Sequence, residues 1–543
     1  MVLGTSGTQR FIFESTKRRE NVGASYLVTR IEESWLDEAL SQSDASRASR
    51  IRTEPVEVVT ANAGGIIALV REPGIGRALV RAITDRALDE APGLDVCGAV
   101  GPAFEWDGAD ALAEALHRTR AQLATVRLSL PGPQARFPGL PLAAQCTSSG
   151  LPAKAIIRPA PGEQLQPRSA ASIAKLEAFG SALERLTGKM GPSRGDTQRS
   201  AALRSVVDHL GFRADWTAVV HVDGNGLGRV FQNLPAVMRS QGRTTAEGYT
   251  DGLRDLSQGV DECVEKAFRQ TVAELETRGE GLIEGCLPLL PLVLGGDDLT
   301  VICDGAVALA FTERYLTLFQ EYAQDDERVG GLLVRAGEPA LGASAGVAIV
   351  KRQYPFRSAV ALAEALTQEA KTVKAKLGPD RCALSFHVLY ESAVADLARL
   401  RAGTTLPDGT RLTAQPYVVG DPGHDPDGWS RHRHWDDLRR RVDALSRTNG
   451  DGDKVVAGGQ AHDLRSGLFV GKDVADSRFS LLTTRLGDAV KDLAAEEDSL
   501  FWTHDGVACT GLLDAMDAVG FLAGGSRAGG SRAGDFRAGG GGE

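Results

Sequence analysis

The amino-acid sequence predicts an α+β protein that contains two ferredoxin-like domains, a helical linker and a mostly helical C-terminal domain. Two observations predict the paired domains. The order strand, helix, hairpin, helix, strand occurs twice, and each hairpin has a glycine-rich turn. Beyond residue 400 the apolar residues follow a mainly helical pattern. The 543 residues are enough for several domains, each with its own core.

The first copy of this pattern lies within residues 1–130. Residues 9–19, "QRFIFESTKRR", are predicted to form a short strand that runs into a helix. A pair of apolar strands follows at 55–70, then an amphipathic helix at 74–91 and a strand at 94–101. We expect a proline-rich linker with a helix at about 169–190 to occupy residues 131–205.

The second copy lies within residues 206–400. Its strand at 216–231 enters a glycine-rich turn, and long helices follow to about residue 276. The remaining elements are predicted as a hairpin at 290–304, a helix at 307–323, a strand at 341–350, a helix at 357–377 and a strand at 382–389. The C-terminal domain is expected over 401–521, and the Gly/Arg/Ser-rich residues 522–543 are predicted to be disordered.

The composition excludes several classes of protein. A net charge of -10 argues against a surface that binds nucleic acid mainly by charge. No apolar run is long enough to cross a bilayer, and the N-terminus has no signal peptide pattern. The cysteines show no C-x-x-C spacing, so neither structural zinc nor a disulfide framework is expected. We therefore expect a cytoplasmic protein with no membrane contact. The cysteines are Cys97, Cys146, Cys263, Cys286, Cys303, Cys382 and Cys509.

Two adjacent aspartates, Asp297 and Asp298, interrupt the apolar stretch "LPLLPLVLGGDDLTVICDG". A carboxylate held near an apolar core without compensation costs several kcal/mol, so the pair needs exposure, a partner or a cation. An ordinary hairpin turn is the alternative, because Gly-Gly and Asp are common in turns. A polymerase palm places such carboxylates on its central hairpin and on its first strand, which here ends at Asp223. Together the three aspartates predict a catalytic, oxygen-rich site for two Mg²⁺ or Mn²⁺ ions.

Glycines and lysines near these aspartates predict a nucleotide site. Backbone amides around Gly224, Gly226 and Gly228 could cradle a triphosphate before a helix start, although an ordinary turn is the alternative. Gly295 and Gly296 would let a nucleotide approach the backbone. Lys371 and Lys374 lie one helical turn apart and could bind phosphate, although a solvated helix face is the alternative.

The motifs "HVDGNGLG", "LVLGGDDL", "SAGVAIV" and "EAKTVKAK" occur in this order and resemble the second palm domain of the large polymerase-like subunit of type III CRISPR systems. They are more distantly similar to GGDEF-type nucleotide cyclases. "RFIFESTKRRENVGASYLV" looks like the opening of the family's first, degenerate palm, so the resemblance covers roughly residues 9–400. It implies conversion of ATP into cyclic oligoadenylate, a second messenger of antiviral defence. It also implies that the three aspartates bind metal and that Ser344 and Lys371 belong to the nucleotide site.

The sequence departs from the family pattern in three respects. The chain begins directly at the first palm, which suggests a compact form without the family's HD nuclease domain, and its late "HD" pairs are isolated. The cysteines often found between the palms are reduced to Cys146. The chain is also short for a full subunit of a guide-RNA complex, which argues against regulation by a guided target RNA. RNA and other subunits of a defence complex stay open as partners. The isolated pairs are His424-Asp425, His462-Asp463 and His504-Asp505.

Two other functions stay open at this point. The protein could be a non-catalytic, nucleotide-binding scaffold, or it could be a cyclase that uses GTP. Catalysis is favoured because one copy keeps its carboxylates while the hairpin of the other, "TANAGG" at 60–65, has none. We expect the two palms to pack together, with the acceptor nucleotide on the first; the alternative is that the first palm only buries apolar surface.

Overall fold

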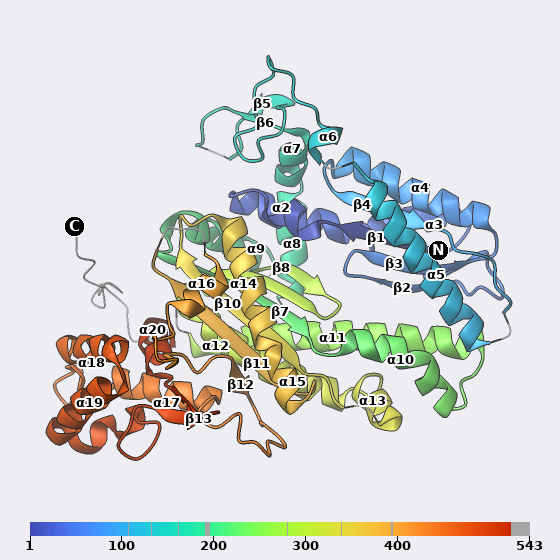
Figure 1. Ribbon diagram of the computed structural model, residues 1–543. Coiled ribbons are helices and arrows are strands. Elements are labelled where there is room, and N and C mark those ends of the chain that lie inside the picture. Colours follow the sequence, from blue (N-terminus) through green and yellow to red (C-terminus); the bar gives the residue numbers. More distant parts are fainter. Residues whose placement is uncertain are drawn as a thin grey trace.

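The computed structural model describes residues 1–522 apart from 107, 132, 161, 191–195, 280, 338 and 392–394. A four-stranded and a six-stranded β-sheet lie in neighbouring halves of the molecule, and a mostly helical part lies beyond the larger sheet (Figure 1). This arrangement confirms the predicted α+β fold class. Residues 523–543, predicted to be disordered, lie outside the described part.

The first sheet has the strand order β2-β3-β1-β4, with every neighbouring pair antiparallel. With its intervening helices this is the ferredoxin-like arrangement. Its strands are β1 (Val2–Ser6), β2 (Val56–Asn62), β3 (Gly65–Val70) and β4 (Asp95–Ala99). The helices of this half are α1 (Thr8–Phe13), α2 (Arg18–Thr29), α3 (Ser34–Ser41), α4 (Pro73–Glu90) and α5 (Ala109–Ser129).

The predicted strand at 9–19 is wrong. The first strand is Val2–Ser6, and the following apolar run belongs to the helix Thr8–Phe13. Gly7 separates the two elements in a left-handed conformation, with φ 62°. A buried run as short as Phe11, Ile12 and Phe13 has no clear period, so packing against α2 decides its structure.

The helix predicted at about 169–190 in the linker is confirmed, but the structure divides it into two helices. Its elements are α6 (Pro133–Arg136), β5 (Ala155–Ile157), β6 (Gln166–Arg168), α7 (Ala170–Glu177), α8 (Phe179–Lys189), α9 (Asp196–Asp208) and η1 (His209–Arg213). Arg168 and Glu20 are both buried and form an ion pair of 3.3 Å, which fastens the linker to α2.

The larger sheet has the order β12-β11-β10-β7-β9-β8, and its last four strands repeat the ferredoxin-like order. Strands β7 and β10 are central and almost entirely buried, as their runs of Val, Ala and Ile require. The strands are β7 (Trp216–Gly224), β8 (Leu289–Gly295), β9 (Asp298–Asp304), β10 (Ala343–Lys351), β11 (Cys382–Leu389) and β12 (Tyr417–Val419).

Helices pack closely against this sheet. A Cβ on Gly346 of β10 would lie 2.1 Å from the Ala363 carbonyl oxygen, so only glycine lets α14 pack this closely. The long helix α11 packs against β2 of the first sheet and thereby joins the two halves (Figure 1). The helices are α10 (Leu227–Ser240), α11 (Ala246–Arg278), α12 (Gly305–Asp325), α13 (Gly330–Ala336), α14 (Phe356–Ala370) and α15 (Thr372–Leu377).

The C-terminal part packs on the larger sheet through α20, which contacts α12 and α17. Its elements are α16 (Leu397–Ala402), α17 (Trp435–Ser446), α18 (Gly458–Val470), α19 (Lys472–Leu486), η2 (Gly487–Leu493), β13 (Trp502–His504), β14 (Val507–Cys509) and α20 (Leu512–Leu522). Across the described residues of the whole chain, no helix has the length and apolarity needed to cross a membrane.

Candidate active site

The two palm hairpins correspond residue by residue. The first closes with Asn62 opposite Gly65, and the second closes with Gly295 opposite Asp298. Each ladder also has an irregularity at the same distance from the turn, between Val58 and Thr60 in the first and between Pro291 and Val293 in the second. The shared bulge indicates that the two sheets are copies of one structural plan.

This correspondence shows what stands in the first palm at each acidic position of the second. Gly64 and Gly65 occupy the places of Asp297 and Asp298. Leu3 pairs with Ile66 as Val222 pairs with Leu299, so Gly4 takes the place of Asp223. At this edge the second sheet therefore has three aspartates where the first sheet has three glycines.

The three aspartates of the second palm gather where β7 ends beside the β8–β9 turn. A Cβ on Gly224 would lie 2.8 Å from the Asp297 Cβ, so the Asp297 side chain lies against the end of β7. Burial and, to a lesser extent, the neighbouring Asp223 together raise the pKa of Asp297 to about 6. Burial and the charge of Asp297 raise the pKa of Asp298 to about 7. The site therefore disfavours its own negative charge, which a bound cation would compensate.

Lys371 supplies a positive charge to this cluster. Its Nζ forms an ion pair with an Asp223 carboxylate oxygen, and its side chain is 18% exposed. The single helix predicted over 357–377 is divided at Lys371, because α14 ends at Ala370 and α15 begins at Thr372. Lys374 lies in α15 and is exposed.

The glycine-rich loop after Asp223 is held from below by a residue that the sequence reasoning missed. Asn225 is buried; its Oδ1 accepts a hydrogen bond of 2.9 Å from the Ser344 hydroxyl, and its Nδ2 donates one of 2.9 Å to the Arg381 carbonyl. The Ser344 hydroxyl is therefore already hydrogen-bonded to this loop through Asn225. Gly226 precedes α10 with φ 79°, and Gly228 lies in the first turn of that helix. An Asn between two glycines was the available signal.

Two further acids, also missed, hold the hairpin turns. Asp261 on α11 accepts hydrogen bonds from the Gly296 amide, at 2.5 Å, and from the Asn62 side chain, at 2.8 Å. Glu32 accepts one of 2.7 Å from the Gly64 amide. Burial raises the pKa of Glu32 to about 7. Nothing in the sequence distinguishes these acids from the many others on helix surfaces.

The predicted packing of the two palms against each other is confirmed at these turns. A Cβ on Gly296 would lie 3.4 Å from the Ala63 Cβ, and one on Gly295 would lie 3.7 Å from the Ala63 amide nitrogen. A cavity of about 160 Å³ lies between the palms, with Glu32, Gly64 and Asp298 in its wall. The two glycines thus face the first palm.

A second cavity, of about 400 Å³, lies on the first palm beside its three glycines. Arg120 and Arg127 of α5 also line it. A Cβ on Gly4 would lie 2.7 Å from Nη2 of Arg127. Helix α5 follows β4 as α14 follows β10. The same strand position is therefore met by a basic residue in both palms, Arg127 of α5 in the first and Lys371, just after α14, in the second.

The acidic cluster has the oxygen chemistry that a hard divalent cation requires. In the part of the chain that the structure describes, no group of three or more His, Cys, Asp and Glu side chains is arranged to hold a metal ion. Lys371 instead neutralises Asp223. The metal assignment of Asp223, Asp297 and Asp298 therefore stays a prediction.

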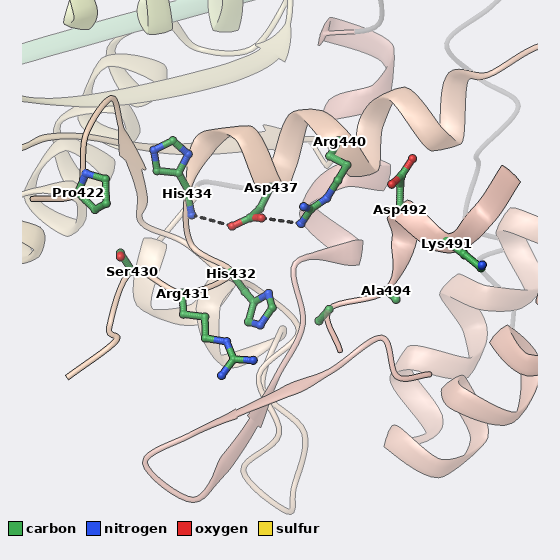
Figure 2. A pocket seen from close by; sticks show the side chains of 11 residues that line it. Pro422, Ser430, Arg431, His432, His434, Asp437, Arg440, Lys491, Asp492 and Ala494 are labelled. Carbon is green, nitrogen blue, oxygen red and sulfur yellow. Dashed lines mark hydrogen bonds and ion pairs between the residues drawn. The ribbon is translucent and has the colours of Figure 1, made fainter. Parts of the chain in front are cut away.

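A further cavity, of about 540 Å³, lies away from these aspartates in the C-terminal part (Figure 2). Its cationic side chains include Arg440, which is paired with Asp437 at 2.6 Å, and Lys491, which is paired with Asp488 at 2.6 Å. The charges at its wall are thus already compensated, and none of its lining residues belongs to either palm sheet. We do not place the chemistry here.

Residues 216–378 match the family model of the second palm domain of Cas10/Cmr2. The chain contains a Cas10-type second palm. This confirms the resemblance to the polymerase-like subunit of type III CRISPR systems. The Cas10-type palm holds Asp223, Asp297, Asp298 and Lys371 within the matched residues. No curated protein matches the chain.

Several solved structures are similar to this chain at low sequence identity. A Csm1–Csm4 cassette in complex with pppApA is 13% identical, with a TM-score of 0.50 over 95% of this chain and 69% of that chain. A Csm1–Csm4 cassette in complex with cA4 is 15% identical, with a TM-score of 0.49 and the same coverage. Csm1 of T.onnurineus is 15% identical, with a TM-score of 0.47 over 92% of this chain and 65% of that chain.

Proposed function

We propose that this protein is a metal-dependent nucleotidyltransferase that converts ATP into cyclic oligoadenylate. The observation that carries the proposal is the asymmetry between the palms, because only the second has carboxylates at the three equivalent positions. A protein that merely needed two packed sheets would gain nothing from burying three like charges at one edge. A catalytic site that binds cations explains both their presence and their confinement to one palm.

Asp223, Asp297 and Asp298 would hold two Mg²⁺ or Mn²⁺ ions. Such ions activate an attacking 3′-hydroxyl and stabilise the leaving pyrophosphate. Lys371 reaches this edge of the sheet, so its ammonium group would leave Asp223 and bind nucleotide phosphate as a point charge. Gly224 keeps the space beside Asp297 open, and Asn225 keeps the loop in place.

The acceptor nucleotide would bind to the first palm. Gly4, Gly64 and Gly65 line the cavity of about 400 Å³ together with Arg120 and Arg127. Guanidinium groups bind phosphate without a metal ion, so the first palm can dispense with carboxylates. The adjacent cavity between the palms is where the two nucleotides would meet.

The fold comparison supports adenine nucleotides and a partner subunit. The similar structure with pppApA is a Csm1–Csm4 cassette, and we propose that the present chain likewise binds ATP and assembles with other subunits of an RNA-guided defence complex. No residue of the described site securely reads the base, so GTP is the competing substrate.

A non-catalytic nucleotide-binding scaffold is the second candidate. The ion pair between Lys371 and Asp223 favours it, because a lysine can neutralise the acidic edge permanently in place of a metal ion. In that case the three aspartates would bind no Mn²⁺.

Product analysis separates the candidates. The purified protein is incubated with ATP or with GTP in the presence of Mn²⁺, and the products are resolved by mass. The proposal expects cyclic oligoadenylate from ATP and pyrophosphate release. Bound but unconverted nucleotide would support the scaffold, and conversion of GTP alone would reassign the substrate.

A further inference from the structure

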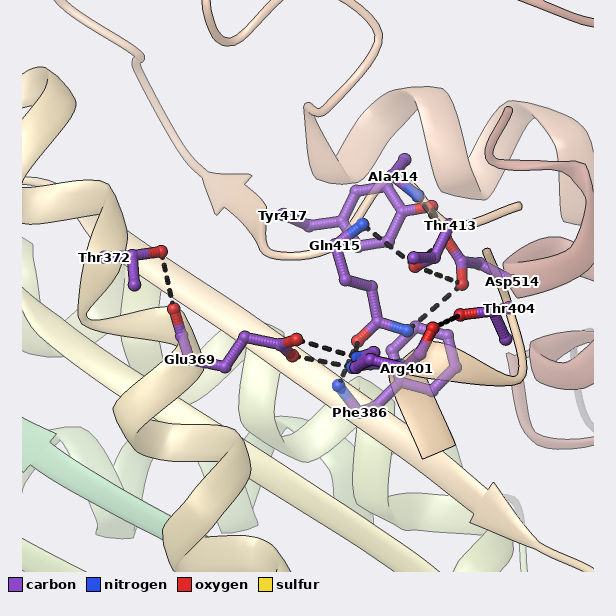
Figure 3. Close-up of polar contacts among 10 residues, drawn as sticks. All are labelled: Glu369, Thr372, Phe386, Arg401, Thr404, Thr413, Ala414, Gln415, Tyr417 and Asp514. Carbon is purple, nitrogen blue, oxygen red and sulfur yellow. Dashed lines mark hydrogen bonds and ion pairs between the residues drawn. The ribbon is translucent and has the colours of Figure 1, made fainter. Parts of the chain in front are cut away.

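A continuous chain of polar contacts connects the C-terminal helix α20 to the end of α14 (Figure 3). Arg401 of α16 donates two hydrogen bonds to the Glu369 carboxylate, at 2.6 and 2.7 Å. Arg401 also donates to the Gln415 side-chain oxygen at 3.1 Å, and the Gln415 Nε2 donates to Asp514 of α20 at 3.1 Å. Every link between Glu369 and Asp514 is therefore a direct hydrogen bond.

The far end of this chain is firmly fixed. Asp514 is 5% exposed, and its carboxylate also accepts hydrogen bonds from the Ala414 amide, at 2.7 Å, and from the Tyr417 hydroxyl, at 2.8 Å. The Gln415 oxygen accepts a further bond of 2.6 Å from the Phe386 amide of β11. Buried polar groups that are satisfied on all sides hold their geometry well.

The near end lies two residues from the lysine of the candidate active site. Residues at i and i+2 point away from each other on a helix, so Glu369 and Lys371 leave the end of α14 in different directions. Arg401 holds Glu369 on one side, and Asp223 holds Lys371 on the other. The Thr372 hydroxyl also donates to the Glu369 carbonyl at 2.7 Å, across the break between α14 and α15.

The ion pair has the character of a specific clamp. Both side chains are largely buried, with 18% and 21% exposed, and the contact is bidentate. A bidentate Arg–carboxylate pair fixes orientation as well as distance, which a lysine in place of Arg401 would not reproduce. This contact lies at the end of α14, which stops at Ala370.

We propose that Arg401 and Glu369 are positioning residues for Lys371, and that through Gln415 and Asp514 the C-terminal helix α20 sets where Lys371 meets nucleotide phosphate. This inference rests on the proposed function for its kinetic consequence. Its structural consequence, a fixed α14–α15 junction, is independent of catalysis.

The kinetic test compares R401Q with R465Q. Arg465 also makes an ion pair with α20, to Asp517 at 3.0 Å, but among the described residues none of its hydrogen bonds or ion pairs reaches α14. R401Q should raise the KM for ATP about tenfold with kcat nearly unchanged, and R401K should restore only part of the loss. R465Q should match the wild type. In a K371A background, R401Q should add little, because both changes act through one contact.

Equal effects of R401Q and R465Q, or an R401Q effect that persists in full beside K371A, would overturn the inference. The milder variant E369Q, which keeps the side-chain shape, provides the same comparison if R401Q fails to fold. If the wild type forms no product, hydrogen exchange decides independently. Residues 365–377 should exchange faster in R401Q or E369Q than in R465Q, and equal exchange would refute the clamp.

Discussion

Asp261 of the second palm and Asn62 of the first are joined by a hydrogen bond of 2.8 Å, so the carboxylate that holds the turn of the acidic hairpin also holds its counterpart. Asn62 donates as well to the Ser257 hydroxyl, at 2.7 Å. The two turns are thereby fixed relative to each other by side chains of α11.

Asn62→Ala should lower the free energy of unfolding by about 1–3 kcal/mol, because it leaves the half-buried Asp261 and the buried Ser257 short of a donor. Urea denaturation measures the change. Gln270→Ala is the matched control, since it removes an exposed hydrogen bond to Glu274 on the same helix and should cost less than about 0.5 kcal/mol. Equal costs for both variants would mean that the contact between the turns contributes no stability.

The stability of Glu32→Gln relative to the wild type should depend on pH. Burial raises the pKa of Glu32 from 4.5 to about 7 in the folded protein, so the folded state binds the proton more tightly than the unfolded state. The contribution of Glu32 to the free energy of unfolding therefore falls as pH rises from about 4.5 to about 7, and it stays constant above pH 7. Glutamine does not titrate and can still accept from the Gly64 amide.

The free energy of unfolding of Glu32→Gln, relative to the wild type, should therefore rise across that pH interval by at most about 3 kcal/mol. Denaturant midpoints at pH 5, 6, 7 and 8 measure it. Glu33→Gln is the control, because Glu33 is exposed and next in the chain. A difference that stays constant over this range would show that Glu32 is ionised throughout.

Lys371→Ala should weaken ATP binding and strengthen Mn²⁺ binding. The lysine competes with cations for Asp223, so its removal frees a carboxylate, while the nucleotide loses a phosphate contact. We expect the KM for ATP to rise about tenfold and the Kd for Mn²⁺ to fall severalfold in calorimetric titration. Lys374→Ala is the control, since this exposed lysine has no such partner in the described contacts, and Asp223→Ala should instead collapse kcat. Weaker Mn²⁺ binding in Lys371→Ala would contradict the competition.

The first palm should bind its own nucleotide. We expect two ATP molecules per chain, and Arg120→Glu combined with Arg127→Glu should remove one while the acidic site keeps the other. Arg118→Glu is the control, because Arg118 lies on the same helix but not in the cavity wall. Gly64 is a poor probe: its φ of 73° and a Thr5 hydroxyl 2.7 Å from any added Cβ would strain the turn itself. One nucleotide per wild-type chain would leave the first palm as packing only.

Sequence reasoning predicted the doubled fold well, because strong apolar strands and glycine turns repeat in the same order. It misplaced the first strand, since Phe11–Phe13 has no period and the true strand, Val2–Ser6, is short. It singled out Asp223, Asp297 and Asp298 as candidates because aspartates inside apolar strands are conspicuous, and their catalytic role stays a prediction. It could not identify Glu32, Asp261 or Arg401, whose roles arise from contacts between residues far apart in the chain. The correspondence of Gly4 with Asp223 also required the strand register.

The most direct test of the central claim is product formation by the wild type and by Asp297→Asn/Asp298→Asn, with ATP and Mn²⁺. The wild type should release pyrophosphate and form cyclic oligoadenylate, and the variant should lose at least about 100-fold in rate, or about 2.7 kcal/mol of transition-state stabilisation. Without metal the variant should be as stable as the wild type or more so, since burial disfavours both charges. A folded variant that still forms product at the wild-type rate would place the chemistry elsewhere.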